Sequence, residues 1–375
     1  MTHELRVAMI GQKGYPPVHG GIERHVAELA VRLARRGIAV DIYSRPHYSD
    51  ADGSTPESGV RVLRRPSLPT KHLDAISHTV VCTLDSLGRD HDVVHFHALG
   101  PGLLAGLPRW LRGRPTVTTV HGLDWQREKW GRVARTVLRW GEQASARLPD
   151  RTVVVSRALG AHYAAAHGRD TVCIPNGIPT PTRREPRLMG ELGVRAPYIL
   201  FVGRLVPEKG CHVLLDAYAQ LPEELRDAYG LVIAGDAGFT HGYADELRAR
   251  ADRRVIFTGY VHGPVLDELY SNATLVCLPS SLEGLSIALL ESMSYGNACL
   301  VTDIPPNLEA GGETVRTVPP GDPQALAAAL TDLLRAPEER ARLAAAARTR
   351  ALAHYSWETA ADATAALYRE LCGGR

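Results

Sequence analysis

The sequence lacks any apolar run of the roughly 18 residues that a membrane-spanning helix needs. Its first residues pass from a polar start directly into a short apolar run, without the basic start, long apolar stretch and small-residue cleavage site of a secretory signal. The six cysteines are scattered singly, without the paired spacing of disulfides or zinc sites. We therefore expect a cytoplasmic protein with reduced cysteines, at most peripheral at the inner face of the membrane.

Net charge is also small, +2 in total, but the two signs are unevenly distributed along the chain. Lysine plus arginine outnumber aspartate plus glutamate by 24 to 16 over residues 1–180, whereas the ratio is 19 to 25 over residues 181–375. The two parts therefore carry +8 and −6. This asymmetry is typical either of a surface for an anionic acceptor or membrane, or of a solvated arginine-rich face. We expect no nucleic acid among the partners, and the sequence leaves the oligomeric state open.

The length of 375 residues suits two domains of roughly 150 to 200 residues each. Two series of apolar, strand-like runs alternate with helical patterns, which predicts an α/β fold of two Rossmann-like, doubly wound domains facing a central cleft. A proline- and arginine-rich run at 180–197 separates the two series. The expected strands are 6–11, 38–43, 93–96, 116–120 and 152–155 in the first series, and 198–202, 231–234, 255–258 and 274–278 in the second.

A loop rich in glycine follows the first expected strand. It covers residues 12–21 and leads into a helical pattern over residues 22–36. Gly20 and Gly21 close this loop, and glycine lets the backbone approach a ligand closely.

Two glutamates enclose an apolar segment in the second series. If a helix begins near Leu285, the amides of Leu285 and Ser286 present a positive dipole end that suits phosphate. Glu283 and Glu291 would then lie roughly 12 Å apart if the segment is wholly helical. One carboxylate would bind sugar hydroxyls and the other ribose hydroxyls. The same spacing is equally consistent with an exposed first-turn glutamate and an ordinary helical one.

Two cations occupy the turn between the first strand and first helix of the second series. Arg204 and Lys209 there would neutralise a diphosphate and stabilise the charge that develops as it departs. The alternative is a pair of surface salt bridges. Lys209 does not belong to a phosphate-binding loop of the Walker type, because the chain lacks the Gly-x4-Gly-Lys-Ser/Thr pattern.

Together these motifs resemble glycosyltransferase family four, a family with the GT-B fold, and the resemblance covers nearly the whole chain. It rests on the order and separation of motifs that are weak individually. They are the glycine loop and helix start at 20–26, Ile-Pro-Asn-Gly-Ile at 174–178, Arg204, Glu-Lys-Gly at 208–210, the Glu283 and Glu291 pair, and Tyr-Ser-Trp-Glu at 355–358.

The resemblance implies a retaining hexosyltransferase. Such an enzyme moves a hexosyl unit from a nucleoside-diphosphate sugar to a hydroxyl of a polysaccharide, a lipid-linked acceptor or a small glycoside. It also implies an acceptor-binding domain over 1–180, a nucleotide-sugar-binding domain over 181–353, and a terminal helix within 354–375 that returns to the first domain. Two alternatives remain: a nucleotide-sugar epimerase of related two-domain fold, and a non-catalytic nucleotide-sugar-binding protein.

Roles for individual residues follow from the same resemblance. Arg204 and Lys209 would bind the donor diphosphate, with Glu283 on the transferred sugar and Glu291 on the ribose. The other implied donor contacts are the phosphate-binding amides of Leu285 and Ser286, the glycine loop at Gly20 and Gly21, and Tyr260 in the turn where the family meets the nucleobase. The alternative for Tyr260 is an ordinary turn without a ligand.

His121 ends an expected strand of the first series and matches a histidine that the family places beside the reacting sugar. Asp124 would either activate the acceptor hydroxyl or cap the following helix, and Trp125 is a candidate acceptor contact. His95 and His97 fall on one face of a strand, but no acidic or cysteine partner is near in sequence. We therefore expect no metal site and no cofactor, with the nucleotide sugar as a substrate.

A basic stretch between residues 110 and 151 contains four of the five tryptophans. Amphipathic basic helices with tryptophan rest on anionic lipid, so an anionic or lipid-linked acceptor is one interpretation. The other is that the tryptophans belong to the core or stack on a sugar. The residues in question, all expected within about four helical turns, are Trp125, Arg127, Lys129, Trp130, Arg132, Arg135 and Arg139.

Overall fold

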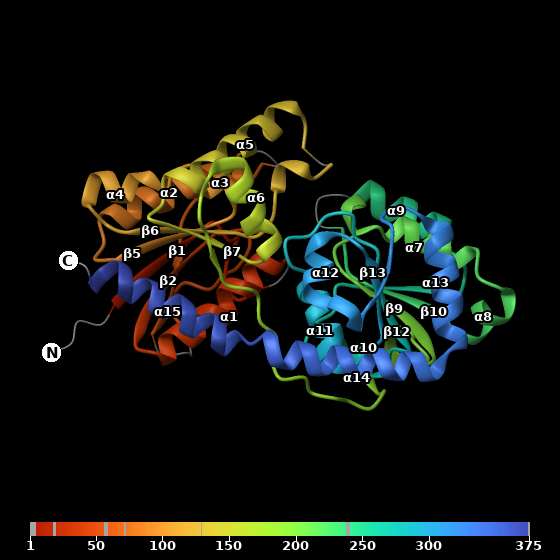
Figure 1. Cartoon of the computed structure of the whole chain (residues 1–375). Coiled ribbons are helices and arrows are strands. Elements are labelled where there is room, and N and C mark those ends of the chain that lie inside the picture. Colours follow the sequence, from red (N-terminus) through yellow and green to blue (C-terminus); the bar gives the residue numbers. More distant parts are fainter. Residues whose placement is uncertain are drawn as a thin grey trace. The chain divides into compact units, whose positions relative to one another are not determined.

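The computed structural model describes residues 5–17, 20–55, 59–70, 73–128, 130–237 and 241–373. The chain forms two compact units, one of Met1–Gly177 with Trp357–Arg375 and one of Ile178–Ser356. Both units are α/β, with helices on either side of a largely parallel sheet (Figure 1). None of the described helices is long and apolar enough to cross a membrane.

In the described part of the first unit, an eight-stranded sheet has the order β3-β4-β2-β1-β5-β6-β7-β8. All neighbouring strands are parallel except β3 and β4. The order reverses between β1 and β5, which makes this the topological switch point of a doubly wound sheet. The strands are β1 Leu5–Ile10, β2 Ile38–Ser44, β3 Gly53–Ser54, β4 Val60–Arg64, β5 Val93–His97, β6 Thr116–Val120, β7 Arg151–Val154 and β8 Val172–Cys173.

Alternation along β1 distributes its side chains between two cores. Val7 and Met9 pack with helix α1 and the terminal helix α15, whereas Ala8 and Ile10 belong to the core on the opposite face. Both faces of the parallel sheet are therefore covered, as such sheets require. The helices of this unit are α1 Gly21–Arg35, α2 Asp74–Leu87, α3 Leu99–Gly102, α4 Gly106–Arg112, η1 Asp124–Gln126, α5 Arg132–Arg147, α6 Arg157–His167 and α15 Trp357–Gly373.

The second unit has a wholly parallel sheet over its described residues, with the order β11-β10-β9-β12-β13-β14. This is the 3-2-1-4-5-6 order of the Rossmann fold, with its switch point between β9 and β12. The elements are β9 Tyr198–Val202, β10 Gly230–Ala234, β11 Val255–Gly259, β12 Leu275–Leu278, β13 Cys299–Thr302, β14 Arg316–Val318, η2 Leu188–Leu192, η3 Pro207–Lys209, α7 Cys211–Ala219, α8 Glu223–Ala228, α9 His241–Arg250, α10 Pro264–Asn272, α11 Ile287–Tyr295, α12 Pro305–Gly311, η4 Gly312–Thr314, α13 Pro323–Arg335 and α14 Pro337–His354.

Helix α15 follows the second unit in sequence but packs on α1 of the first. Small residues, Ala360, Ala361 and Ala365, are buried in the shared core, so the two helices approach closely. At the rim, Glu358 lies 2.9 Å from both Arg32 and Arg36. The expected return of the terminal helix to the first domain is confirmed, as is the fold of two Rossmann-like domains.

Candidate active site

The second unit brings its sequence-predicted cations and carboxylates to the switch point of its sheet. Arg204 and Lys209 follow β9, and Glu283 follows β12, the strand beside β9. Chains leave the carboxyl ends of these two neighbouring strands, which is where open α/β sheets bind ligands. The sequence identifies these residues, and the strand order explains how they meet.

A glycine permits the two loops to approach. Gly210 has φ +71°, and a Cβ there would lie 2.1 Å from the carbonyl oxygen of Pro279. The amide of Ser281 donates to the carbonyl of Glu208 at 2.9 Å, which fastens the loops together. Across them the Lys209 ammonium donates to Glu283 Oε1 at 2.5 Å. The Lys209 side chain is 19% exposed and the Glu283 side chain 9%, so water has little access to the ion pair.

Helix α11 begins at Ile287 rather than near Leu285. Ser286 is its N-cap, and its hydroxyl accepts from the amide of Leu289 at 3.3 Å. Leu285 and Glu283 therefore lie in the turn before the helix. The separation of 12 Å expected for a wholly helical segment does not apply, because a capping hydroxyl starts the helix later than the apolar pattern indicated.

Glu291 lies inside α11 and is 5% exposed. The hydroxyl of Tyr270 donates to its Oε2 at 3.2 Å, and the Tyr270 ring stacks on that of Tyr295. Glu291 is thus a buried, hydrogen-bonded carboxylate rather than an exposed helical glutamate. The alternative of an exposed first-turn glutamate also fails for Glu283, which is largely buried and paired.

Tyr260 lies directly after β11 and is 42% exposed. Its ring stacks on His262 with centroids 5.8 Å apart. Tyr260 is therefore a partly exposed aromatic side chain at the carboxyl end of a parallel strand.

In the first unit, Gly20 and Gly21 start helix α1 directly after the loop that follows β1. Gly20 has φ +101°, and a Cβ there would meet a carboxylate oxygen of Glu23 at 2.3 Å. The other oxygen of Glu23 accepts from the amide of Lys13 at 3.1 Å. Glycine at position 20 therefore lets Glu23 hold the loop against its own helix.

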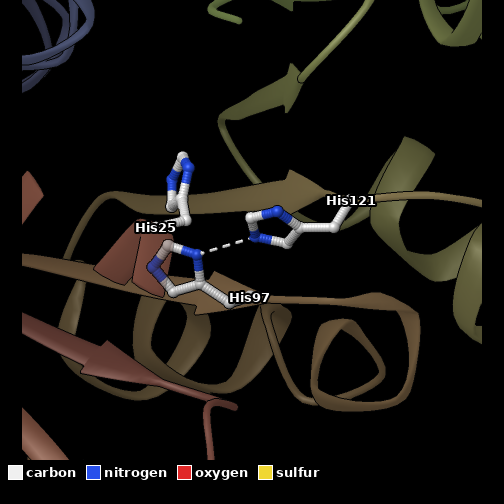
Figure 2. Close-up of side chains that lie close together, drawn as sticks. All are labelled: His25, His97 and His121. Atoms are coloured by element: carbon white, nitrogen blue, oxygen red, sulfur yellow. Dashed lines mark hydrogen bonds between the residues drawn. The ribbon is translucent and has the colours of Figure 1, made fainter. Parts of the chain in front are cut away.

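Three histidines gather at the carboxyl ends of β5 and β6 (Figure 2). His97 ends β5 and His121 follows β6, and His97 Nδ1 lies 3.2 Å from His121 Nε2. His25, from α1, stands edge-on to His121 with ring centroids 4.7 Å apart. The amide oxygen of Asn176, in the Ile-Pro-Asn-Gly-Ile motif, lies 2.9 Å from His25 Nδ1. The sequence singled out His121 but missed its association with the other two histidines.

Burial, which is nearly complete for His25 and His97 and partial for His121, favours the neutral form of the three imidazoles. It lowers the pKa of His25 to about 4, against a hydrogen bond to Asn176 that raises it. Burial, followed by the proximity of the other histidines, also lowers the pKa values of His97 and His121 well below 6.5. Neutral histidines both donate and accept hydrogen bonds, as sugar hydroxyls do.

Both ring nitrogens of His95 lie at hydrogen-bond distance from hydroxyl groups, which leaves neither of them for a metal ion. His95 lies on the same face of β5 as His97, as alternation predicts, and the rings stack 4.2 Å apart. However, its nitrogens are 2.5 Å from the Tyr368 hydroxyl of α15 and 2.7 Å from the Thr119 hydroxyl. His95 therefore ties the terminal helix to the sheet.

Asp124 and Trp125 lie in the short helix η1 after His121. Asp124 forms an ion pair with Arg127 at 2.8 Å, and the Trp125 indole donates to Glu142 Oε2 at 2.5 Å. The guanidinium of Arg139 lies 4.6 Å from the centre of the Trp125 ring. Trp125 is half-buried, with both its edge and its face engaged by α5.

The basic stretch is not one continuous helix. Residue 125 belongs to η1, helix α5 begins only at Arg132, and Lys129 lies outside the described residues. The interpretation of the tryptophans as core residues is wrong for two of them, because Trp110 and Trp140 are 64% and 60% exposed.

Comparisons with known proteins agree with this architecture. Residues 19–181 match the family model described as Glycosyltransferase Family 4, and residues 190–350 match that described as Glycosyl transferases group 1. The chain is 28% identical to alpha-maltose-1-phosphate synthase of Mycobacterium tuberculosis, over 98% of this chain and all of that protein. Its fold is similar to that of sucrose-phosphate synthase from Thermosynechococcus elongatus, with a TM-score of 0.84, 22% identity and coverage of 99% and 100%. Anabaena HepE in complex with UDP-glucose gives a TM-score of 0.80, 21% identity and coverage of 98% and 100%.

The fold and the two matches define a glycosyltransferase of the GT-B fold that uses a nucleotide-sugar donor. The chain belongs to glycosyltransferase family four. Neither the epimerase nor the non-catalytic binding protein is favoured by these relatives, two of which are named as synthases.

Proposed function

We propose that this enzyme transfers a hexosyl unit to an acceptor hydroxyl with retention of anomeric configuration, and that it holds its donor diphosphate without a metal ion. The observation that carries the proposal is the buried pair of Lys209 and Glu283, beside the turn into helix α11. Positive side chains and a helix N-terminus then do what a metal does in other transferases.

Lys209 has three N–H donors, of which Glu283 takes one. The carboxylate aims the ammonium, and the remaining donors suit phosphate oxygens. Arg204, five residues earlier in the same turn, adds a second cation with a forked donor geometry. The start of α11 adds a partial positive charge. We propose that these groups stabilise the nucleoside diphosphate as it gains charge in the transition state.

Retention follows if the acceptor attacks the face from which the diphosphate departs. The bond from the anomeric carbon to the phosphate oxygen breaks, the bond to the acceptor oxygen forms, and the acceptor proton passes to the departing phosphate oxygen. Glu283 contacts the transferred sugar and orients Lys209 in this scheme. Because the acceptor oxygen attacks the anomeric carbon directly, this scheme gives Glu283 no role as a covalent nucleophile.

His121 is proposed to hydrogen-bond a hydroxyl of the reacting sugar. Its neutral state, enforced by burial, lets it accept or donate without adding charge to the site. His97 and His25 hold it in place, and Asp124 lies three residues further on, at the start of η1. We propose Gly20 and Gly21 as donor contacts through their backbone, Glu291 as the group that recognises ribose, and Tyr260 as a stacking surface for the nucleobase.

The donor is proposed to be a nucleoside-diphosphate hexose, of which UDP-glucose is the first to test. This rests on the fold shared with HepE, which binds UDP-glucose.

The acceptor side is proposed to work at an anionic membrane surface, on its cytoplasmic face. Val133, Val137 and Trp140 recur at helical spacing on α5 and are 80%, 36% and 60% exposed. Three exposed arginines flank this apolar stripe, at 132, 135 and 139. An apolar stripe beside cations is the pattern of helices that lie in the headgroup region of anionic lipid.

One experiment separates the candidate activities. The enzyme is incubated with each nucleoside-diphosphate hexose, with and without an acceptor glycoside, and the products are followed by proton NMR. We expect turnover that depends on the acceptor and a product with the anomeric configuration of the donor. An inverted product would contradict the retaining mechanism, and conversion of the donor sugar alone would show an epimerase.

A further inference from the structure

Besides the histidines around His121, a second cluster of metal-ligating side chains lies in the first unit. Glu142 of α5 meets His162 and His167 of α6. The Nε2 atoms of His162 and His167 lie 2.6 and 2.8 Å from the same oxygen, Glu142 Oε1. The other oxygen, Oε2, accepts from the Trp125 indole.

From this arrangement we propose that Glu142, His162 and His167 bind a transition-metal ion of the zinc class that joins helices α5 and α6. Two imidazoles and one carboxylate form a donor set of the kind that binds zinc with one open position for water. The predominance of nitrogen ligands disfavours magnesium and calcium, which prefer oxygen.

The spacing of the three ligand atoms requires only a small adjustment. All three lie within 4.8 Å of one another. Bonds of about 2.0 to 2.2 Å in a tetrahedral site separate ligand atoms by about 3.3 to 3.5 Å. Each histidine nitrogen would therefore move about 0.5 to 0.9 Å away from Glu142 Oε1, within the range of side-chain rotation. In the metal-bound form each ring would present an unprotonated Nε2 to the ion and carry its proton on Nδ1.

The groups around these ligands suit a metal site. Metal-binding carboxylates are themselves held by hydrogen bonds, and the Trp125 indole supplies one at 2.5 Å. Next to the cluster, Ser145 of α5 and Tyr163 of α6 bond at 2.6 Å through their hydroxyls, which fixes the helix pair. Glu142 is nearly buried, whereas the His162 side chain is 33% exposed and gives an ion access from solvent.

Charge favours this cluster over the one containing His121. Glu142 supplies a negative charge that offsets part of the charge of a divalent ion, and transferring an uncompensated charge out of water is costly. The other cluster, His25, His97 and His121, contains no carboxylate to supply such a charge. The positive charge of Arg127 also acts on His121 and lowers its pKa. The ion therefore belongs at Glu142.

Such an ion would not belong to the proposed donor phosphate site, whose cations Arg204 and Lys209 are part of the other unit. It would join two helices and, through Glu142 and Trp125, fix the short helix η1 that carries Asp124. That consequence for acceptor positioning rests on the proposed function, whereas ion binding itself does not. The ion would have a structural role, and the donor diphosphate would still be held by Arg204 and Lys209.

The test measures zinc binding by the full-length protein, without a purification tag and stripped with chelator. Competition against a chromophoric chelator should show one tight site, at least tenfold weaker in His162→Ala and in His167→Ala. Trp125→Phe, which removes the outer hydrogen bond, should weaken binding about 10- to 100-fold. His354→Ala, an exposed histidine of α14 in the other unit, is the matched control and should bind as the native protein does.

X-ray absorption of the zinc-loaded native protein needs no variant and guards against misfolding. Two imidazoles with oxygen ligands at about 2.0 to 2.2 Å are expected. The absence of a saturable site, equal binding by the native protein and both histidine variants, or a zinc shell without imidazole would overturn the inference. Donor binding measured in chelator reports separately on the proposed function, since Glu142 has no part in it.

Discussion

Lys209 and Glu283 form an ion pair at 2.5 Å although 74 residues separate them in the chain. The pair exists because β9 and β12 are neighbours at the switch point and because Gly210 lets their loops touch. A buried pair of this kind contributes little net stability, because the loss of hydration by both charges offsets their attraction. Its value is geometric: the carboxylate fixes the direction of the cation that we place on the donor diphosphate.

Substitution at Gly210 tests the loop contact. Gly210→Ala places a methyl group where the Pro279 carbonyl lies 2.1 Å away, whereas Gly193→Ala, at a similar φ of +75°, meets nothing within 4 Å. Both variants should lose about 1 to 2 kcal/mol of stability, because alanine is strained in the left-handed backbone conformation. We expect only Gly210→Ala to lose an additional 1 to 3 kcal/mol of stability, about the range for overpacking, and most of its transfer activity. Equal denaturation midpoints and rates for the two variants would contradict the loop contact.

The buried histidines make the first unit sensitive to acid. The folded pKa of His25 is about 4 and its ordinary value is 6.5, so between these values the unfolded chain binds more protons. Stability should therefore be present in full above pH 6.5 and fall as the pH drops towards 4, by up to about 3 kcal/mol for this residue.

Urea unfolding followed by tryptophan fluorescence measures this effect, because all five tryptophans belong to the first unit. His25→Leu should reduce the slope of the unfolding free energy against pH by up to the contribution of one proton taken up on unfolding. His354→Ala, on the exposed end of α14, should leave it unchanged. A native protein equally stable at pH 4.5 and 7 would show that these histidines are not held neutral.

The fold could be predicted from the sequence because it consists largely of strongly apolar strands, and glycines mark the ends of its elements. Thr116–Val120 and Tyr198–Val202 have the bounds expected for them. The strands β3, β4 and β8 of the first unit and β13 and β14 of the second were missed; of these, β3, β8 and β14 lie at sheet edges. The three edge strands have only two or three residues each, and their positions depend on pairing with a neighbour rather than on their own pattern.

The effect of chelation on transfer tests the proposal that the donor diphosphate is held without a metal ion. We expect transfer to survive exhaustive chelation, because Arg204, Lys209 and the start of α11 hold the diphosphate. Initial rates in chelator, compared with rates after adding magnesium, manganese or zinc, check this. Rates abolished by chelator and restored only by magnesium or manganese would contradict the proposed donor site. A fall in thermal stability reversed by zinc alone would instead reflect the site at Glu142.

The surface of α5 predicts binding to anionic vesicles. Native protein should bind them at low salt and dissociate as rising salt shortens the Debye length from about 10 to 3 Å. Vesicles of neutral lipid should bind it poorly. Co-sedimentation across a salt series is the measurement. Insensitivity to salt, or equal binding to both lipids, would exclude the electrostatic contact.

A triple variant locates that contact. Replacing Arg132, Arg135 and Arg139 by glutamine should weaken vesicle binding and acceptor use without changing donor affinity. The control replaces three exposed arginines of the second unit, Arg250, Arg335 and Arg342, and should bind vesicles as the native protein does. If the first variant keeps full binding and activity, α5 is a solvated face and the acceptor is a small soluble molecule.

The site was less predictable from the sequence than the fold. Arg204, Lys209 and Glu283 could be named because they sit in motifs, but their pairing is set by strand order. The partners of His121 could not be found, since His25 comes from a helix almost a hundred residues earlier. One signal was present: His97 ends a strand that neighbours the strand before His121. Glu142 and its two histidines lack a motif altogether.

The most direct test of the donor site is the kinetic effect of Lys209→Ala and Arg204→Ala. Each variant removes a cation from a diphosphate that gains charge as the sugar bond breaks, so kcat/KM should fall by about 100- to 1000-fold. Arg195→Ala, an exposed arginine before β9, is the control and should remain near the native value. If both active-site variants are folded and turn over at close to the native rate, the assignment of these residues to the donor diphosphate is wrong.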